Sequence, residues 1–333
     1  MKWWRRFWKM AKKFTLAALF TLLAAIASLG LGSVKLSLPT LFRAILDGPT
    51  ATAGYIFWYV RLPRTAACLL AGAALSVSGA VIQGVLHNRL ASPSIIGVNA
   101  GAGLAVTLCC ALGVLSGWAI AGSAFFGAML AVLLIVFASE KAGASRTTVI
   151  LGGVAVNATL NALSEALTTL FPDIAALSGD FRVGGFASVT TPRLIPAGIL
   201  ILLALLAVFT LRHELDLLAL GDESAQSLGL NVKTVRTLLL ILAAMLSGAA
   251  VSFSGLLGFI GLIIPHAMRK FSGTESGHLL PLCALGGAAF VTLCDTAART
   301  LFAPYELPVG ILLSILGGPF FLLLLLQRKS GPK

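Results

Sequence analysis

The sequence predicts an all-α, polytopic membrane protein with about ten transmembrane helices. Of its 333 residues, 58% are hydrophobic and only 11% are charged, and the mean hydropathy is +0.98, which excludes a water-soluble globular domain. Several apolar runs reach the roughly 20 residues that cross a bilayer. Helices are expected because only helices and closed barrels satisfy their backbone hydrogen bonds in lipid.

The chain opens with a basic and aromatic segment, residues 1–13 (MKWWRRFWKMAKK). Tryptophan rings and basic groups together are typical of an anchor at the cytosolic headgroups. Residues 14–328 are expected to form a single ten-span domain. The expected spans are residues 14–34, 61–85, 94–114, 118–139, 147–171, 193–211, 237–254, 256–271, 279–302 and 307–326.

Basic residues set the expected orientation. If the N-terminus is inside, the cytosolic segments hold 17 of the 24 Lys and Arg residues, as the positive-inside rule requires. Both termini are therefore predicted to be cytoplasmic. The net charge of +12 follows from this topology, so binding to nucleic acid is not expected.

The polar segment 213–236 is the longest polar interruption in the C-terminal half. Its leucines at 215–220 predict a short amphipathic helix that Gly221 breaks, and Asp222–Leu228 predicts a second helix closed by Gly229. Two short helices on the cytosolic membrane surface would suit the docking of another protein. A solvated connection between two spans explains this stretch alone equally well.

One internal repeat is visible by eye. Gly72–Gly79 (GAALSVSG) matches Gly248–Gly255 (GAAVSFSG) at six of eight positions. The two copies lie in spans of opposite direction, which indicates inverted four-helix repeats over about 62–171 and 237–328. The alternative is that small-residue spans resemble one another because Gly, Ala and Ser let helices pack closely.

Gly255, Gly258 and Gly261 lie three residues apart at the start of the eighth expected span. This spacing predicts one smooth helix face for close packing.

Arg61, Arg64 and Arg299 are all expected at the outer ends of spans. One interpretation is snorkelling or pairing within the chain, for which Asp295 lies four residues before Arg299. The other is a basic outer rim that receives carboxylates from a partner, because the planar arginine fork binds carboxylate bidentately.

Asn157, Asn161 and Glu165 are four residues apart in the fifth span and predict a polar stripe. An ionisable group inside the membrane is a pathway candidate. Hydrogen bonding between helices explains the stripe equally well.

Catalytic and metal-binding patterns are missing from the sequence. The four His and five Cys residues show no metal-ligand spacing, and no phosphate-binding GxxxxGK[ST] loop occurs. No catalytic residue, metal or cofactor is therefore expected on this chain.

Four blocks of sequence carry a specific resemblance. They begin at Arg61 (RLPRTAACLLAGAALSVSG), Leu217 (LLALGDESAQSLGL), Ser254 (SGLLGFIGLIIPHAMR) and Cys294 (CDTAARTLFAPYELPVG). In order and spacing they resemble the FecCD/BtuC-type permeases, the membrane subunits of ABC importers for iron-siderophores, haem and vitamin B12. The resemblance covers nearly the whole chain after the first span.

The resemblance implies a dimer with a second permease copy or a sister permease in the bacterial inner membrane. It implies two cytosolic ABC ATPases, which bind ATP-Mg themselves and dock on the paired helices within residues 217–229. It implies an extracytoplasmic binding protein that docks on Arg61, Arg64 and Arg299. The docking positions implied for the ATPases are Leu217, Leu218, Leu220, Gly221, Asp222, Glu223, Ala225, Leu228 and Gly229.

The resemblance also implies inner gates at Asn88, Arg89 and Leu90 and at Thr147 and Thr148. This chain has Arg89 where the family pattern has proline, which weakens the first gate assignment. The expected function is ATP-driven import of a metal chelate by alternating access, with ferric siderophore first, then haem or cobalamin. The alternative from another class is an ion-coupled secondary transporter that uses Glu165 or Asp295.

Overall fold

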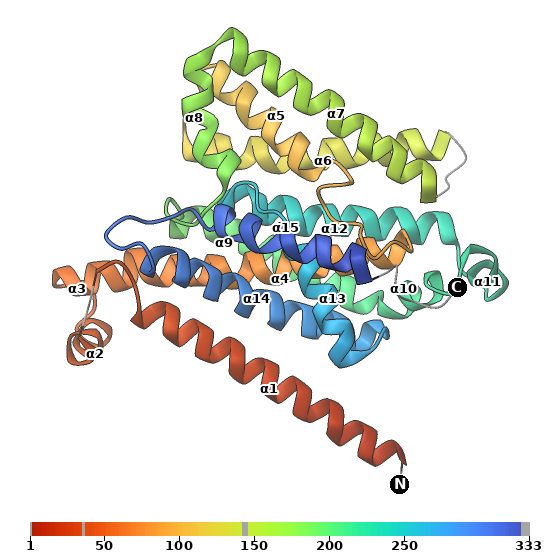
Figure 1. Cartoon of the computed structure of the whole chain (residues 1–333), viewed down its shortest axis with the longest axis horizontal. Coiled ribbons are helices and arrows are strands. Elements are labelled where there is room, and N and C mark those ends of the chain that lie inside the picture. The colour runs from red at the N-terminus through yellow and green to blue at the C-terminus, as the bar shows by residue number, and fades with distance from the viewer. Residues whose placement is uncertain (1, 35–36, 142–145, 328–333) are drawn as a thin grey trace.

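The computed structural model describes residues 2–34, 37–141 and 146–327, without the side chains of residues 2–9, 38, 325 and 327. The part so described is all-helical (Figure 1). Most of the side chains of the expected N-terminal anchor, and the basic tail after residue 327, lie outside it. The helices are α1 (Lys2–Gly30), α2 (Leu38–Leu46), α3 (Thr52–Tyr55), α4 (Leu62–Val85), α5 (Val98–Ala111), α6 (Gly117–Lys141), α7 (Arg146–Leu170), α8 (Pro172–Val183), α9 (Thr191–Thr210), α10 (Arg212–Leu218), α11 (Asp222–Ser227), α12 (Val232–Ser254), α13 (Ile260–Ser272), α14 (Ser276–Thr300) and α15 (Val309–Gln327), with a π-helical turn at Ile56–Arg61.

A helix stands at each of the ten expected spans: α1, α4, α5, α6, α7, α9, α12, α13, α14 and α15. Among the described residues, seven helical segments are long and apolar enough to cross a membrane. Helices α5 and α13 fall short of that length, with 14 and 13 residues, whereas α15 has 19. Short helices need an irregular segment to complete the path across the bilayer.

The glycine spacing at 255–261 does not form one helix face, and that prediction is wrong. Gly255 has φ +68° and ends α12, and Phe259 has φ +65° just before α13 begins. Only Gly261 of the three glycines lies in a helix. Positive φ is open to glycine at no steric cost, so this glycine-rich stretch breaks the helix and reverses the chain.

Helix α4 occupies the centre of the bundle and is almost wholly buried. A Cβ at Gly72 would lie 2.2 Å from the Gly287 carbonyl of α14, and a Cβ at Gly79 would lie 2.0 Å from the Gly261 carbonyl of α13. Backbones touch at both crossings, since nothing larger than hydrogen fits there. This is the small-residue packing that holds membrane helices together.

Helices α4 and α12 carry the two copies of the GAA-x-S-x-SG motif, and they run in opposite directions (Figure 1). They are in contact, since Ser78 Oγ donates to the Ala243 carbonyl at 2.7 Å. The lengths also recur in order: α4, α5 and α6 have 24, 14 and 25 residues, and α12, α13 and α14 have 23, 13 and 25. The inverted repeat stays a prediction, which this order supports.

The two ends of the bundle differ. At one end lie α2, α3 and the connection from α14 to α15, and at the other lie α10, α11 and the start of α1 (Figure 1). The end of α15 lies on the same side as α10 and α11. We call these the outer and inner ends, following the orientation that the basic residues predict.

We expect Gly79→Ala to destabilise the protein, because the added methyl forces the backbones of α4 and α13 apart. Overpacking of this kind costs about 1–3 kcal/mol. Thermal unfolding of the purified chain in detergent measures it. The matched control is Gly122→Ala in α6, where a Cβ meets nothing within 4 Å and the melting temperature should not fall. Equal melting of the two variants would contradict the close approach.

Candidate functional site

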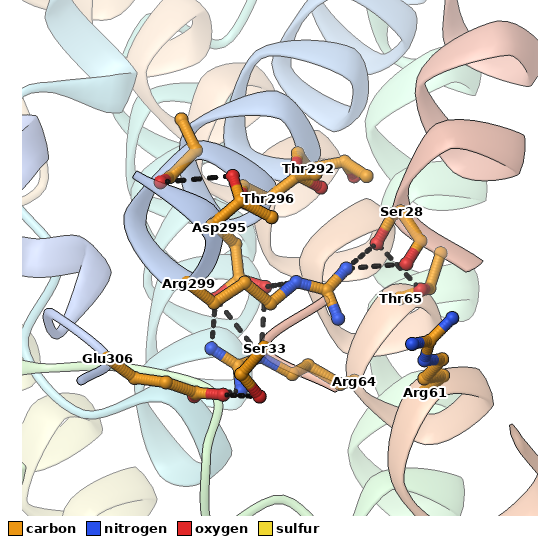
Figure 2. Close-up of polar contacts among 12 residues, drawn as sticks. Ser28, Ser33, Arg61, Arg64, Thr65, Thr292, Asp295, Thr296, Arg299 and Glu306 are labelled. Atoms are coloured by element: carbon orange, nitrogen blue, oxygen red, sulfur yellow. Dashed lines mark hydrogen bonds and ion pairs between the residues drawn. The ribbon is translucent and has the colours of Figure 1, made fainter. Parts of the chain in front are cut away.

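A buried network of charges joins α4, α14 and the connection to α15 at the outer end (Figure 2). Arg64 forms a fork with Asp295, with Nε and Nη2 each 2.9 Å from a carboxylate oxygen. Its Nη1 donates to Glu306 Oε2 at 2.7 Å. Asp295 is fully buried, whereas the Glu306 side chain is 32% exposed. The guanidinium of Arg64 is therefore hydrogen-bonded to carboxylates of its own chain.

The other two arginines hold helix α1. Arg299 Nη2 donates to the Ser28 carbonyl at 2.6 Å, and its Nε lies 3.6 Å from Asp295 Oδ2. Arg61 donates to the carbonyls of Leu29 and Gly30 at 2.7 Å each. These carbonyls are at the C-terminus of α1, where a cation is favoured by the helix dipole. Both arginines therefore clasp α1 to α4 and α14.

The three arginines do not form an exposed basic surface in this chain. Arg61, Arg64 and Arg299 do meet at the outer end, but they are 2%, 7% and 3% exposed. The pairing within the chain that the sequence left open is what the structure has. The physical reason is that a charge in a helix bundle is stable only when it is paired and hydrogen-bonded. A role of the arginines in docking stays a prediction.

The segment after α9 forms two short helices, as predicted. Helix α10 ends at Leu218, Gly221 has φ +112°, and α11 then begins at Asp222. Gly229 follows α11 with φ +86°. Both glycines lie in the region of φ that side chains avoid, so the bends depend on them.

The two helices bury one face and leave apolar groups on the other. Leu218 and Ala225 are buried against the bundle, and Leu217 is half-buried. Leu220 and Leu228 are each 62% exposed, beside the exposed Glu223 and Gly229. Exposed leucines with a charged neighbour fit a surface that another protein covers.

Asp222 ties α11 to the bundle. Arg236 Nη2 of α12 lies 2.7 Å from Asp222 Oδ1, and Arg146 Nη2 donates to the same oxygen. Burial alone would raise the pKa of the Asp222 carboxyl, but Arg236 and Arg146 outweigh it and hold the pKa below its usual value. With a lowered pKa in the folded state, the stabilisation is present at neutral pH and is lost only as the pH falls through that value.

Helix α10 is anchored separately. Asp216 Oδ1 accepts a hydrogen bond from the backbone N–H of Ser276, at the start of α14, at 2.9 Å. His87 Nε2 lies 2.6 Å from the Leu218 carbonyl. A movement of α10 therefore acts on α14 and on the turn after α4.

That turn holds the first expected gate. Asn88 Oδ1 accepts the N–H of Leu90 at 3.0 Å, a local turn contact. Arg89 is exposed, and an asparagine-nucleated turn does not need the proline of the family pattern. The gating role of these three residues stays a prediction.

Helix α7 carries the second expected gate and the polar stripe. Thr147 is exposed and Thr148 half-buried in its first turn. Asn157 Nδ2 donates to the Ser94 and Ile95 carbonyls at 2.8 and 3.1 Å, which binds α7 to the segment before α5. Asn161 and Glu165 are exposed on this chain. The stripe is therefore split between a packing contact and an open face.

Three residues of these networks are not identified by the sequence patterns. Arg146 and Arg236 pair with Asp222, and Glu306 pairs with Arg64. The available signals were Glu306, the acidic residue directly before Leu307 and Pro308, and the acidic pair Asp222 and Glu223 directly after Gly221. Neither named its partner, because the partners are distant in sequence.

A sequence profile of the FecCD transport family matches residues 20–327. The chain belongs to the FecCD transport family. This makes it a multi-pass permease of the ABC-transporter class, and the resemblance of the four sequence blocks is confirmed.

Relatives of this FecCD permease are named for different transported substrates. It is 38% identical to the hemin transport system permease protein HmuU of Yersinia pestis over 314 residues, which is 92% of each chain. It is 35% identical to the iron(3+)-hydroxamate import system permease protein FhuB of Bacillus subtilis over 331 residues, 93% of this chain and 81% of FhuB. It is 38% identical to the vitamin B12 import system permease protein BtuC of Salmonella paratyphi A over 293 residues, 84% and 86% of the two chains.

A solved structure shares the fold of this FecCD permease. It is described as an inward-facing conformation of a metal-chelate type ABC transporter, with a TM-score of 0.85 and 30% identity over 95% of this chain and 99% of that one. The BtuC-like fold class is confirmed.

We expect Asp295→Asn to destabilise this FecCD permease strongly, because it leaves the buried Arg64 and Arg299 without their shared carboxylate. Removing one partner of a buried pair costs about 3–5 kcal/mol. Thermal unfolding in detergent measures the loss. Glu306→Gln is the control: its side chain is partly exposed and the amide can still accept from Arg64, so the loss should be much smaller. The same loss in both variants would contradict the ranking.

Proposed function

We propose that this chain is the transmembrane subunit of an ABC importer that brings a metal chelate into the bacterial cytoplasm. Its first candidate cargo is a ferric siderophore, followed by haem and cobalamin. Family membership and the names of the relatives support the chelate class, and their identities of 35–38% are too close to rank its members. Two partner ATPases would bind ATP-Mg and supply the energy, and a second permease copy or a sister permease would complete the pathway.

The observation that carries the proposal is the pair of ion pairs that Asp222 makes with Arg146 and Arg236, which we call the Asp222 clamp. Its carboxylate joins α11, whose neighbours Leu220 and Leu228 are exposed, to the first residue of α7 and to α12. A partner that covers the leucines and moves α11 would pull on the inner end of α7 through Arg146. Helix α7 has exposed apolar and polar groups along its length, including Asn161 and Glu165, which suits a helix that lines a pathway between two copies.

Helix α10 extends this linkage. Through Asp216 it holds α14, and through Leu218 it holds the turn with Asn88 and Arg89. Motion imposed at the inner end would thus reach both expected gates. With α10 and α11 in the cytosol, both chain ends lie in the cytosol of a bacterial inner-membrane protein.

The outer binding protein would meet Arg64 through Glu306. Ser33 Oγ donates to Glu306 Oε1 at 2.9 Å, and Arg64 holds Oε2. A carboxylate of the binding protein can reach Arg64 only by displacing this partly exposed group, because Asp295 is fully buried. Arg61 and Arg299 would act indirectly, by positioning α1.

The ion-coupled alternative has no support. Asp295 is fully buried and is paired with Arg64 and Arg299, so it serves as a packing contact and presents no accessible carboxylate to a pathway. Membership of an ABC permease family also speaks against it.

We expect Asp222→Asn to uncouple the transporter. The complex would still hydrolyse ATP, but uptake would fall about tenfold, the factor that corresponds to roughly 1.4 kcal/mol and to one lost charge-assisted hydrogen bond. The assay is ATP hydrolysis and uptake of haemin and a ferric siderophore in proteoliposomes that hold the permease, its ATPase and its binding protein.

The control for this variant is Glu275→Gln, which removes an exposed inner-end carboxylate whose ion-pair partner within the described residues is His278. Its uptake per ATP should equal that of the wild type. Normal coupling in Asp222→Asn would remove the clamp from the mechanism, and absence of any ATPase from the purified complex would remove the proposed function.

We expect Glu165→Gln to keep ATP-driven uptake within about twofold of the wild type, because the exposed carboxylate has no proton to carry in this mechanism. Uptake is measured with ATP in the presence and absence of a protonophore. Loss of uptake in the variant, or collapse of wild-type uptake with the protonophore, would favour the ion-coupled transporter instead.

A further inference from the structure

The inner end holds a polar cavity of about 320 Å³ behind α10. It lies among the end of α4, the turn that follows it, α10, α13 and the start of α14. The groups that matter for its chemistry are Gln83, His87, Arg89, Asp216, Arg269 and Thr274. Its volume suits a small polar ligand.

Two arginines from different elements line this cavity without a carboxylate. Arg89 comes from the turn after α4, and Arg269 from the last turn of α13. Within the part of the chain that the structure describes, neither is within salt-bridge distance of an acidic group, whereas Arg64, Arg146, Arg236 and Arg299 all are. The two guanidinium charges repel each other.

The one carboxylate in the lining is already engaged. Asp216 Oδ1 accepts from the Ser276 N–H, where it caps α14. It forms no ion pair with Arg89 or Arg269. The cavity thus keeps an excess of positive charge.

Arg269 is held in position for a ligand. Its Nη1 donates to Gln83 Oε1, and Gln83 Nε2 donates to the Gly261 carbonyl at 3.0 Å. The amide therefore fixes the guanidinium through one nitrogen and leaves other donors of the fork for a ligand. A half-buried cation in this setting is stabilised by an anion from outside the chain.

We propose that this cavity binds a phosphate group. Two arginine forks from different elements match the several acceptor oxygens of a phosphate, and the hydroxyl of Thr274, which also lines the cavity, supplies a further donor. The phosphate can come from inorganic phosphate or from the headgroup of an anionic phospholipid in the cytoplasmic leaflet. The chemistry of recognition is the same for both.

A bound phosphate would add a link to those that Gln83 and His87 already make among these elements. It would tie the turn of Asn88 and Arg89 to α13, directly behind α10. It would therefore stiffen the first expected gate. The site does not depend on the proposed cargo or on ATPase docking.

The test uses the purified full chain. Inorganic phosphate is titrated by calorimetry in detergent. In parallel, native mass spectrometry scores retained lipid after release from nanodiscs of phosphatidylglycerol or phosphatidylcholine. The variants are Arg89→Gln, whose exposed side chain can change without loss of folding, and Arg269→Lys, which keeps the charge but not the fork. The control is Arg43→Gln, an exposed arginine on α2.

We expect each site variant to weaken phosphate-group binding at least about tenfold, and Arg43→Gln to leave it unchanged. Weakened binding of inorganic phosphate supports the site with a free anion. Weakened retention of phosphatidylglycerol alone supports it with a lipid headgroup. Wild-type protein that binds neither probe, or equal binding by wild type and both variants, overturns the proposal.

Discussion

The contact of bare backbone along α4 is the constraint on which the rest of the structure depends. At Gly72 and Gly79 this helix touches the main chains of α14 and α13 with no side chain between them. Such contact fixes the spacing of three helices within the width of a methyl group. It also sets what lies at the two ends of α4, because Arg64 stands near one end and the turn with His87 and Arg89 follows the other.

The outer and inner ends then differ in how their charges are satisfied. At the outer end three arginines meet two carboxylates, Asp295 and Glu306, and the remaining charge is met by the carbonyls of α1. Nearly all of these groups are buried and are paired within the chain. At the inner end the ion pairs of Asp222 are partly exposed, and Arg89 has no acidic partner within the described residues. The inner end is therefore the one that an outside partner or ligand can reorganise.

The sequence predicted what depends on neighbouring residues. The ten helices follow from the lengths of apolar runs, and the bend between α10 and α11 follows from Gly221. The features that the sequence did not predict depend on contacts between residues that are far apart in the chain. Arg64 and Asp295 are 231 residues apart, and no local pattern says that they share a fork. The prediction of a continuous helix face before α13 was wrong for another reason. Glycines three residues apart fit a packed helix face or a chain reversal equally well. The packing of Gly255 against the main chain of Phe181 and Gly184 decides between the two.

The way in which α1 is attached has an evolutionary consequence. Arg61 grips Leu29, Gly30 and Val34 through their main-chain oxygens, and those atoms are present whatever the side chain. Of the residues at this grip, Ser28 alone contributes its own hydroxyl, to Arg299 and to Thr65. The identities of the lipid-facing residues of α1 are thus free to vary between species. A first helix taken from a related protein should pack correctly, provided that it keeps Ser28 and also Thr21, whose hydroxyl donates to the Leu285 carbonyl of α14.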